Sequence, residues 1–323
     1  MKKIAKVLTG IVVLIIAGLI TTGLYLKYYL PHIQEAGNIT IDSTPERIEQ
    51  GRYLANHVAV CIDCHSSRDW SVFSGPINGN LGGGGEKFGK EMGFPGTIYA
   101  KNITPYNLGN WTDGELLRAI TTGVNKDGKA LFSLMPYHHY GQMDIEDLYN
   151  IIAYIRTLKP IESRHPDHDL DFPVNLLINT LPHEANFSHK PAKSNVVAYG
   201  QYLVNAAGCV DCHSKTEKGA IIPGTEFGGG MEFQQPGGIV RSANITPHQQ
   251  TGIGSITVED FVQRFQQYTD SSYHPEKLSP GDLNTPMPWT MYSGMTTDDL
   301  KAIYAYLQSL SPIDNMVNHF EKK

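Results

Sequence analysis

An internal duplication sets the architecture of this chain, because the same short motifs occur twice in the same order. Periodic self-similarity of this kind identifies repeated structural units. The chain should therefore fold as two similar units joined by a connecting segment. Cys-x-Asp-Cys-His occurs at 61–65 and 209–213, Asn-Ile-Thr-Pro at 102–105 and 244–247, and Met-Pro-Tyr or Met-Pro-Trp at 135–137 and 287–289.

The duplication divides the 323 residues into five parts. The connector contains five prolines and has no counterpart elsewhere in the chain, so we expect it to pack on the two units rather than fold separately. The C-terminal tail is expected to be loose. The predicted parts are an anchor at 1–30, a first unit at 43–158, the connector at 159–193, a second unit at 194–312 and the tail at 313–323.

Within each unit the pattern predicts helix, loop, helix, loop, helix. Thr44 followed by Pro45 predicts the start of the first helix. The segment 112–115 begins with Thr and ends with Glu, which predicts a capping box. The last helix is expected at 144–158 and again at 296–310, where apolar residues recur at helical spacing. Because alternating strand patterns are lacking, we expect a mainly α fold with long loops.

The N-terminus resembles a membrane-spanning helix. Residues 7–26 are uncharged, and twenty residues at helical rise cover roughly 30 Å, the thickness of the bilayer hydrocarbon. Lys2, Lys3 and Lys6 precede this stretch while Lys27 alone follows it, so the N-terminus should stay in the cytoplasm and the units should lie on the periplasmic side. A cleaved signal peptide is the alternative, but the stretch is long for one.

The four cysteines all belong to the two Cys-x-x-Cys-His motifs, which leaves none for a disulfide framework. A structural zinc site is the alternative use of two such pairs. However, a histidine directly follows each pair, and that five-residue string is typical of covalent haem attachment. We therefore predict two c-type haems, bound covalently through Cys61, Cys64, Cys209 and Cys212, with iron coordinated by His65 and His213.

Methionine is the expected ligand on the opposite face of each iron. Met143 and Met295 directly precede the capping residues of the last helices, so packing at those helix starts explains them. Met135 and Met287 lie in loops, each followed by proline, and no such packing explains them. We predict that Met135 and Met287 are the axial ligands. The alternative is that all four are core residues.

Several neighbouring residues invite weaker predictions. A haem histidine orients itself by donating its second ring nitrogen to an acceptor, and the carbonyls of Pro76 and Pro223 fall at nearly matched distances along the chain. Glycine-rich loops at 82–85 and 228–230 would let the backbone approach the porphyrin closely. The two histidines at 138–139 have no counterparts in the second unit, so we expect them to be exposed or to serve packing.

The Asn-Ile-Thr-Pro strings, the Met-Pro-aromatic loops and the acidic start of the last helix resemble the cytochrome c subunits of membrane-bound alcohol, gluconate and related dehydrogenases. The resemblance covers nearly all of the chain after the anchor. It implies two tandem class I cytochrome c domains with His/Met haems. It also implies transfer of electrons from a periplasmic dehydrogenase subunit to quinone or a terminal oxidase of the respiratory chain. Members of that family usually carry three haem domains, whereas this chain has two.

An iron with both axial positions filled can pass electrons but has no position for a substrate. We therefore expect an electron-transfer protein without catalytic residues. A dihaem peroxidase-like enzyme is the alternative, but it would need one iron that can open, and the two units are closely matched. A haem-based sensor ranks last, because no kinase-like or nucleic-acid-binding segment follows. Nucleic acid is not an expected partner, since no dense Lys/Arg cluster lies outside the N-terminus.

Overall fold

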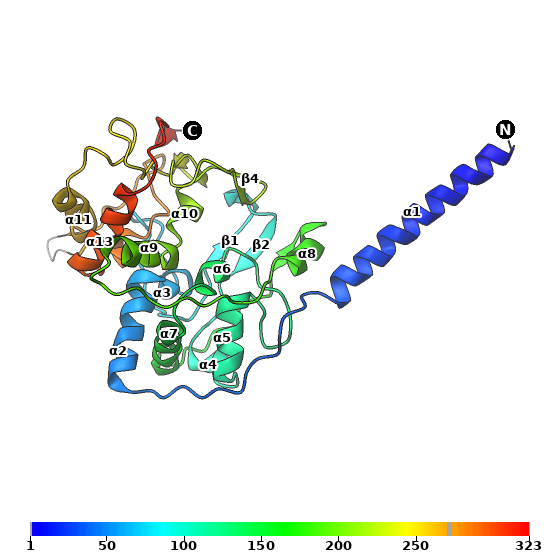
Figure 1. Cartoon of the computed structure of the whole chain (residues 1–323), viewed down its shortest axis with the longest axis horizontal. Coiled ribbons are helices and arrows are strands. Elements are labelled where there is room, and N and C mark those ends of the chain that lie inside the picture. The colour runs from blue at the N-terminus through cyan, green and yellow to red at the C-terminus, as the bar shows by residue number, and fades with distance from the viewer. Residues whose placement is uncertain (1, 270–272, 323) are drawn as a thin grey trace.

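The structure is a computed structural model that describes residues 2–269 and 273–322. The helix α1 (Lys2–Tyr28) projects from a body that contains all the other elements (Figure 1). None of its residues is buried, and it is long and apolar enough to cross a membrane, a test that a signal sequence also passes. The prediction of an apolar helix at 7–26 is therefore confirmed.

Helices dominate both units, as expected. Thr44 caps α2 by accepting a hydrogen bond from the Arg47 amide, and Thr112 with Glu115 forms the complete capping box. The helices of the first unit are α2 (Pro45–Tyr53), η1 (Leu54–Val58), α3 (Cys61–Cys64), η2 (Lys90–Met92), α4 (Pro105–Leu108), α5 (Asp113–Thr122), α6 (Tyr137–Tyr140) and α7 (Ile145–Thr157). Those of the second unit are α9 (Val196–Ala206), α10 (Cys209–Cys212), α11 (Val258–Gln266), α12 (Trp289–Tyr292) and α13 (Thr297–Gln308).

The first and last helices of each unit pack against each other, α2 on α7 and α9 on α13. Glycine allows this close approach. A Cβ atom on Gly51 would lie 1.8 Å from the carbonyl oxygen of Asn150, and one on Gly200 would lie 1.9 Å from that of Ala302. Since real Cβ atoms do not come so near, any larger residue would force the helices apart.

The first unit carries one extra residue before its cysteine motif. Cys61 follows Gly51 by ten positions, whereas Cys209 follows Gly200 by nine. The extra residue is accommodated in η1, a π-helical turn at Leu54–Val58, while α9 stays α-helical throughout. Both motifs then begin directly after a residue in the left-handed region. The π turn thus restores the same geometry at the two motifs.

Short antiparallel strands, which the sequence pattern did not predict, supplement the helices. They form the sheets β1 (Lys87–Phe88), β2 (Gly96–Tyr99) and β3 (Asp169–Leu170); β4 (Thr216–Glu217) and β5 (Ala220–Ile221); and β6 (Glu232–Gln235), β7 (Gly238–Arg241) and β8 (Phe320–Lys322).

Two of these strands lie outside the units. β3 belongs to the connector and pairs with β2 of the first unit, and Lys193 at the end of the connector lies 3.4 Å from Asp299 of the second unit, so the connector contacts both units. The connector also contains α8 (Val174–Leu177) and η3 (Ile178–Thr180), which lie beside the end of α1. The expectation of a loose tail is wrong: β8 pairs with β7 and satisfies backbone groups that would otherwise lie at a sheet edge.

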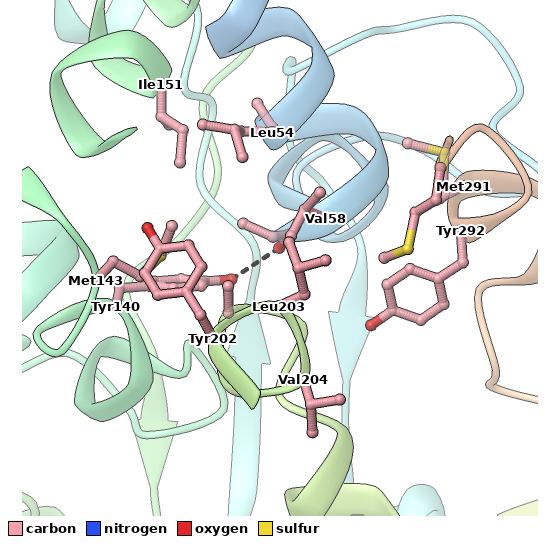
Figure 2. Close-up of a cluster of buried hydrophobic side chains, with 14 of the residues drawn as sticks. Leu54, Val58, Tyr140, Met143, Ile151, Tyr202, Leu203, Val204, Met291 and Tyr292 are labelled. Carbon is pink, nitrogen blue, oxygen red and sulfur yellow. Dashed lines mark hydrogen bonds between the residues drawn. The ribbon is translucent and has the colours of Figure 1, made fainter. Parts of the chain in front are cut away.

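The two units share one hydrophobic core. Figure 2 shows Tyr202 and Leu203 of α9 beside Tyr140 and Met143 of the first unit, within a single cluster of buried residues. At its border the Tyr202 hydroxyl donates a hydrogen bond of 2.7 Å to the carboxylate of Asp147.

The matching contact runs in the opposite direction between the units. The hydroxyl of Tyr53 in α2 donates to the carboxylate of Asp299 in α13. Asp147 and Asp299 are each only 1% exposed. Each unit therefore supplies a tyrosine to a buried carboxylate of the other, as in an approximate twofold arrangement.

Candidate haem-attachment sites

Each cysteine motif forms a single helical turn, α3 or α10, with its histidine directly after the turn. In both motifs the first cysteine is half-buried and the second is exposed, and all four described thiols are free. The four thiols do not converge on one point. Among the described residues, one group of at least three potential ligand side chains lies close enough together to share an ion, and it contains no cysteine. The arrangement therefore fits two separate attachment sites rather than a four-cysteine zinc site.

The two motif histidines are held in the same way. The Nδ1 atom of His65 lies 2.7 Å from the carbonyl oxygen of Lys101, and that of His213 lies 2.7 Å from the carbonyl oxygen of Ala243. Because a carbonyl can only accept, Nδ1 carries the proton and Nε2 keeps its lone pair. Burial lowers the pKa of both rings and so favours the neutral form that binds metal. The residues present thus fit the proximal side of a haem iron.

The predicted acceptors at Pro76 and Pro223 are wrong. The Pro76 carbonyl accepts instead from the Asp69 amide, within the loop that follows the first motif. The true acceptors, Lys101 and Ala243, directly precede the two Asn-Ile-Thr-Pro strings. Position along the chain was a poor guide because the acceptor comes from a segment that returns to the motif through tertiary packing.

The glycine-rich loops explain how that segment returns. A Cβ atom on Gly84 would lie 2.6 Å from the backbone nitrogen of Asn102, and one on Gly229 would lie 2.5 Å from that of Asn244. Both glycines also have positive φ, at 73° and 71°. Close contact between two chain segments therefore accounts for these glycines, and the predicted approach to porphyrin is not needed to explain them.

The Asn-Ile-Thr-Pro strings have a structural role that the sequence reasoning missed. The Asn102 side-chain oxygen accepts from both the amide and the hydroxyl of Thr104, and its amide group donates to the carbonyl of Ile161 at 2.8 Å. Asn244 repeats this with Thr246 and the following segment. Each Asn-Ile-Thr-Pro string therefore holds the segment that carries the histidine's carbonyl acceptor against the segment that follows the last helix of the unit.

The methionines separate into two classes, as the sequence suggested. Met143 and Met295 are 0% and 4% exposed and belong to the shared core. Met135 and Met287 are only partly buried and lie just before the short helices α6 and α12. Packing thus explains the first pair, while coordination of iron by the second pair stays a prediction.

Ser74 of the first unit supports the methionine loop of the second. Its hydroxyl donates to the Met287 carbonyl at 2.6 Å, and its backbone amide donates to the Asn284 side chain at 2.9 Å. Ser74 holds a positive φ of 64°, which is uncommon outside glycine and marks a locally constrained turn. The loop after the first haem motif therefore positions the predicted axial ligand of the other site.

The acidic residue inside each motif is neutralised differently in the two units. Asp63 pairs with Arg68 at 2.8 Å, and both side chains are less than a tenth exposed. Burial raises the pKa of Asp63 to about 6, against the opposing effect of Arg68. Asp211 instead faces His139 and His138 of the first unit, at 3.0 and 3.5 Å. These histidines lower the pKa of Asp211, although burial acts in the opposite direction.

The paired motifs, each followed directly by histidine, are typical of covalent haem attachment in c-type cytochromes. No family model matches the chain. It is 26% identical over 291 residues to the cytochrome c subunit of the quinone alcohol dehydrogenase of Gluconacetobacter polyoxogenes, with 85% of this chain and 58% of the relative covered. It is 28% identical over 286 residues to the fructose dehydrogenase cytochrome subunit of Gluconobacter japonicus, with 81% and 52% covered.

A third relative is nearer in length. The diheme cytochrome c-type protein of Cereibacter sphaeroides is 26% identical over 265 residues, which cover 79% of this chain and 83% of the relative. This chain is therefore similar to cytochrome subunits of alcohol and fructose dehydrogenases, and it spans little more than half the length of those two relatives. The resemblance inferred from the motifs is confirmed.

Proposed function

We propose that this chain is an electron-transfer subunit with two covalent c-type haems in tandem class I cytochrome c domains. The observation that carries the proposal is the matched geometry of the two motifs, in which His65 and His213 each present a free Nε2 atom beside paired thiols. Cys61, Cys64, Cys209 and Cys212 would hold the two porphyrins.

The chain's own residues would set the conditions for one-electron transfer, the chemistry that a His/Met haem supplies. The carbonyls of Lys101 and Ala243 orient the two histidines, and Met135 and Met287 would occupy the opposite faces. The shared core and the exchanged Tyr–Asp contacts hold the two sites in one body. A fixed separation between sites supports electron transfer because no domain rearrangement is then required.

The proposed partner is a periplasmic dehydrogenase, with quinone or a terminal oxidase of the respiratory chain as the next acceptor. This rests on the names of the relatives, which are cytochrome subunits of dehydrogenase complexes. The α1 helix would anchor the chain in the cytoplasmic membrane, with Lys2, Lys3 and Lys6 on the cytoplasmic side. Purification of the full chain in mild detergent should recover a dehydrogenase subunit with it.

Methionine variants test the proposed ligands. Met135→Ala and Met287→Ala should each remove roughly half of the weak sulfur-to-iron absorption at the red end of the oxidised spectrum. Met143→Leu and Met295→Leu serve as matched controls, because these methionines are buried in the core, and should leave the band intact. A band that survives in both alanine variants would show that other groups bind the irons.

A dihaem peroxidase is not favoured, because such an enzyme needs one iron with an axial position that can open to bind peroxide, while the other iron keeps both ligands. The two sites here share histidine geometry and methionine placement. Adding hydrogen peroxide to the half-reduced protein separates the two functions. Rapid turnover of peroxide would contradict the electron-transfer proposal.

A further inference from the structure

Three side chains from both units converge at the face of the second cysteine motif. His138 and His139 lie on α6 of the first unit, and Asp211 lies in α10 of the second. Their ligand atoms all fall within 4.8 Å of one another, the one such group among the described residues. None of the three is a predicted haem ligand. The function proposed above does not account for the cluster.

The tautomer of His139 can be read from its partners. The side-chain amide of Asn205 donates to the His139 carbonyl at 3.1 Å, which fixes the orientation of that amide. Its oxygen consequently faces His139 Nδ1 at 2.8 Å, so Nδ1 is the donor. In a neutral ring Nε2 then carries a lone pair. Metal-binding histidines are held in this way, through a hydrogen bond from the nitrogen that does not bind the metal.

The Nε2 atom of His139 faces a carboxylate oxygen. It lies 3.0 Å from Asp211 Oδ2, yet this buried nitrogen makes no hydrogen bond of acceptable geometry. The His139 side chain is 8% exposed, so bulk water cannot readily separate the two atoms. An unprotonated nitrogen and a carboxylate at this separation repel each other unless a cation, either a proton on Nε2 or a metal ion, lies between them. Burial disfavours the protonated ring, but the Asp211 carboxylate outweighs it and raises the pKa of His139, so a metal ion at this place would compete with a proton.

The spacing suits a small divalent cation. Ligand atoms at 2.0–2.2 Å from a tetrahedral zinc ion lie about 3.3–3.6 Å apart. The distance from Asp211 Oδ2 to His138 Nε2, 3.5 Å, falls in this range, and the distance to His139 Nε2, 3.0 Å, is somewhat shorter. Two imidazoles and one carboxylate are donors that zinc accepts, and three protein ligands leave a position for water.

The first unit provides an internal comparison. Asp63, the counterpart of Asp211, is neutralised by Arg68 within its own unit. The residue that matches Arg68 in the second unit is Thr216, which has no charge to offer. Asp211 therefore depends on the histidine pair of the other unit, and the positions that match this pair, Thr290 and Met291, do not offer two imidazoles.

We propose that His138, His139 and Asp211 form a zinc-type divalent cation site that joins the two units. The ion would neutralise the carboxylate in the second motif and would tie α6 to α10. Such a site is separate from the haem irons and does not require the electron-transfer function to be correct.

Zinc titration of the full haem-loaded chain in detergent tests the site. After treatment with a chelator and dialysis, calorimetry should show one zinc ion bound per chain. His139→Gln should weaken that binding at least 100-fold, and His138→Thr, which inserts the residue of the second unit at a half-exposed position, should weaken it at least 10-fold. His189→Ala is the matched control, since this histidine is fully exposed, and should change the affinity by less than 2-fold.

Zinc K-edge X-ray absorption adds a readout that the haem iron does not obscure. It should report two imidazole nitrogens and one carboxylate oxygen at about 2.0–2.2 Å. Absence of stoichiometric binding would overturn the proposal and indicate a protonated histidine pair instead. Binding that is unchanged in both His138→Thr and His139→Gln would also overturn it, because the ion would then lie elsewhere.

Discussion

Replacing Tyr202 with phenylalanine tests whether the exchanged Tyr–Asp contacts stabilise the packing of the two units. The Tyr202 hydroxyl makes two contacts with the first unit. It donates to Asp147 at 2.7 Å and accepts from the Asp144 amide at 3.2 Å. Phenylalanine fills nearly the same volume, so the change removes these two bonds while leaving the packing of the ring intact.

The magnitude follows from the burial of Asp147. Its side chain is 1% exposed, and after the substitution only Lys190, at 2.6 Å, remains close to its carboxylate. A hydrogen bond to a charged group contributes about 1.5–3 kcal/mol, and a buried group left unpaired adds to that loss. We expect the free energy of unfolding to fall by about 2–3 kcal/mol, which corresponds to a decrease in Tm of about 3–5 °C for a body of this size.

Thermal unfolding of the haem-loaded chain, followed by far-ultraviolet circular dichroism in detergent, measures this loss. Tyr106→Phe is the matched control, because its exposed hydroxyl makes only a long contact of 3.4 Å to Glu162, and should change Tm by less than about 2 °C. Tyr53→Phe should reproduce the loss, since Tyr53 makes the corresponding contact to Asp299. A Tyr202→Phe protein as stable as the parent would refute the reasoning.

Three further substitutions probe the packing. Gly51→Ala should destabilise the first unit by about 3 kcal/mol in urea unfolding, while Gly37→Ala, with space for a methyl group, should cost less than about 1 kcal/mol. Burial lowers the pKa of His57 below its ordinary 6.5, so the unfolded chain takes up the proton at a higher pH than the folded chain. The free energy of unfolding should therefore fall as the pH drops below about 6.5, and His57→Asn should reduce this fall when unfolding is measured between pH 7.5 and 5. Ser74→Ala should alter the red-end absorption associated with Met287 alone, and an equal effect on both haems would contradict the assigned contact.

Local features of the sequence predicted local structure well. Thr44 and Thr112 cap the helices that they were expected to cap, and the apolar spacing located the last helix of each unit within two residues at each end. These signals depend on residues within a few positions of one another, so one sequence contains all the information needed. The packing role of Met143 was predicted for the same reason, because the helix start beside it is visible in the sequence, and its burial in the core confirms that role.

Long-range features could not be predicted in this way. The Lys101 carbonyl that accepts from His65 lies 36 residues away, and a backbone carbonyl has no side-chain identity by which a sequence could reveal it. The strand β8 also escaped prediction, because three residues carry too short a pattern and the partner β7 lies some eighty residues earlier. The extra residue before Cys61 can be counted in the sequence, but its accommodation as a π turn depends on how α2 packs.

The contacts between units show why the duplication produced one body rather than two independent domains. The helical segment before each cysteine motif contacts the short helix that follows the methionine loop of the other unit. His57 of η1 donates to the Met291 carbonyl in α12 at 2.8 Å, and Asn205 of α9 donates to the His139 carbonyl in α6 at 3.1 Å. These two residues occupy matching positions, although their side chains differ. Because each loop also carries the methionine predicted to bind iron, neither unit alone contains all the contacts that hold its own site. The two sites are therefore expected to form or fail together.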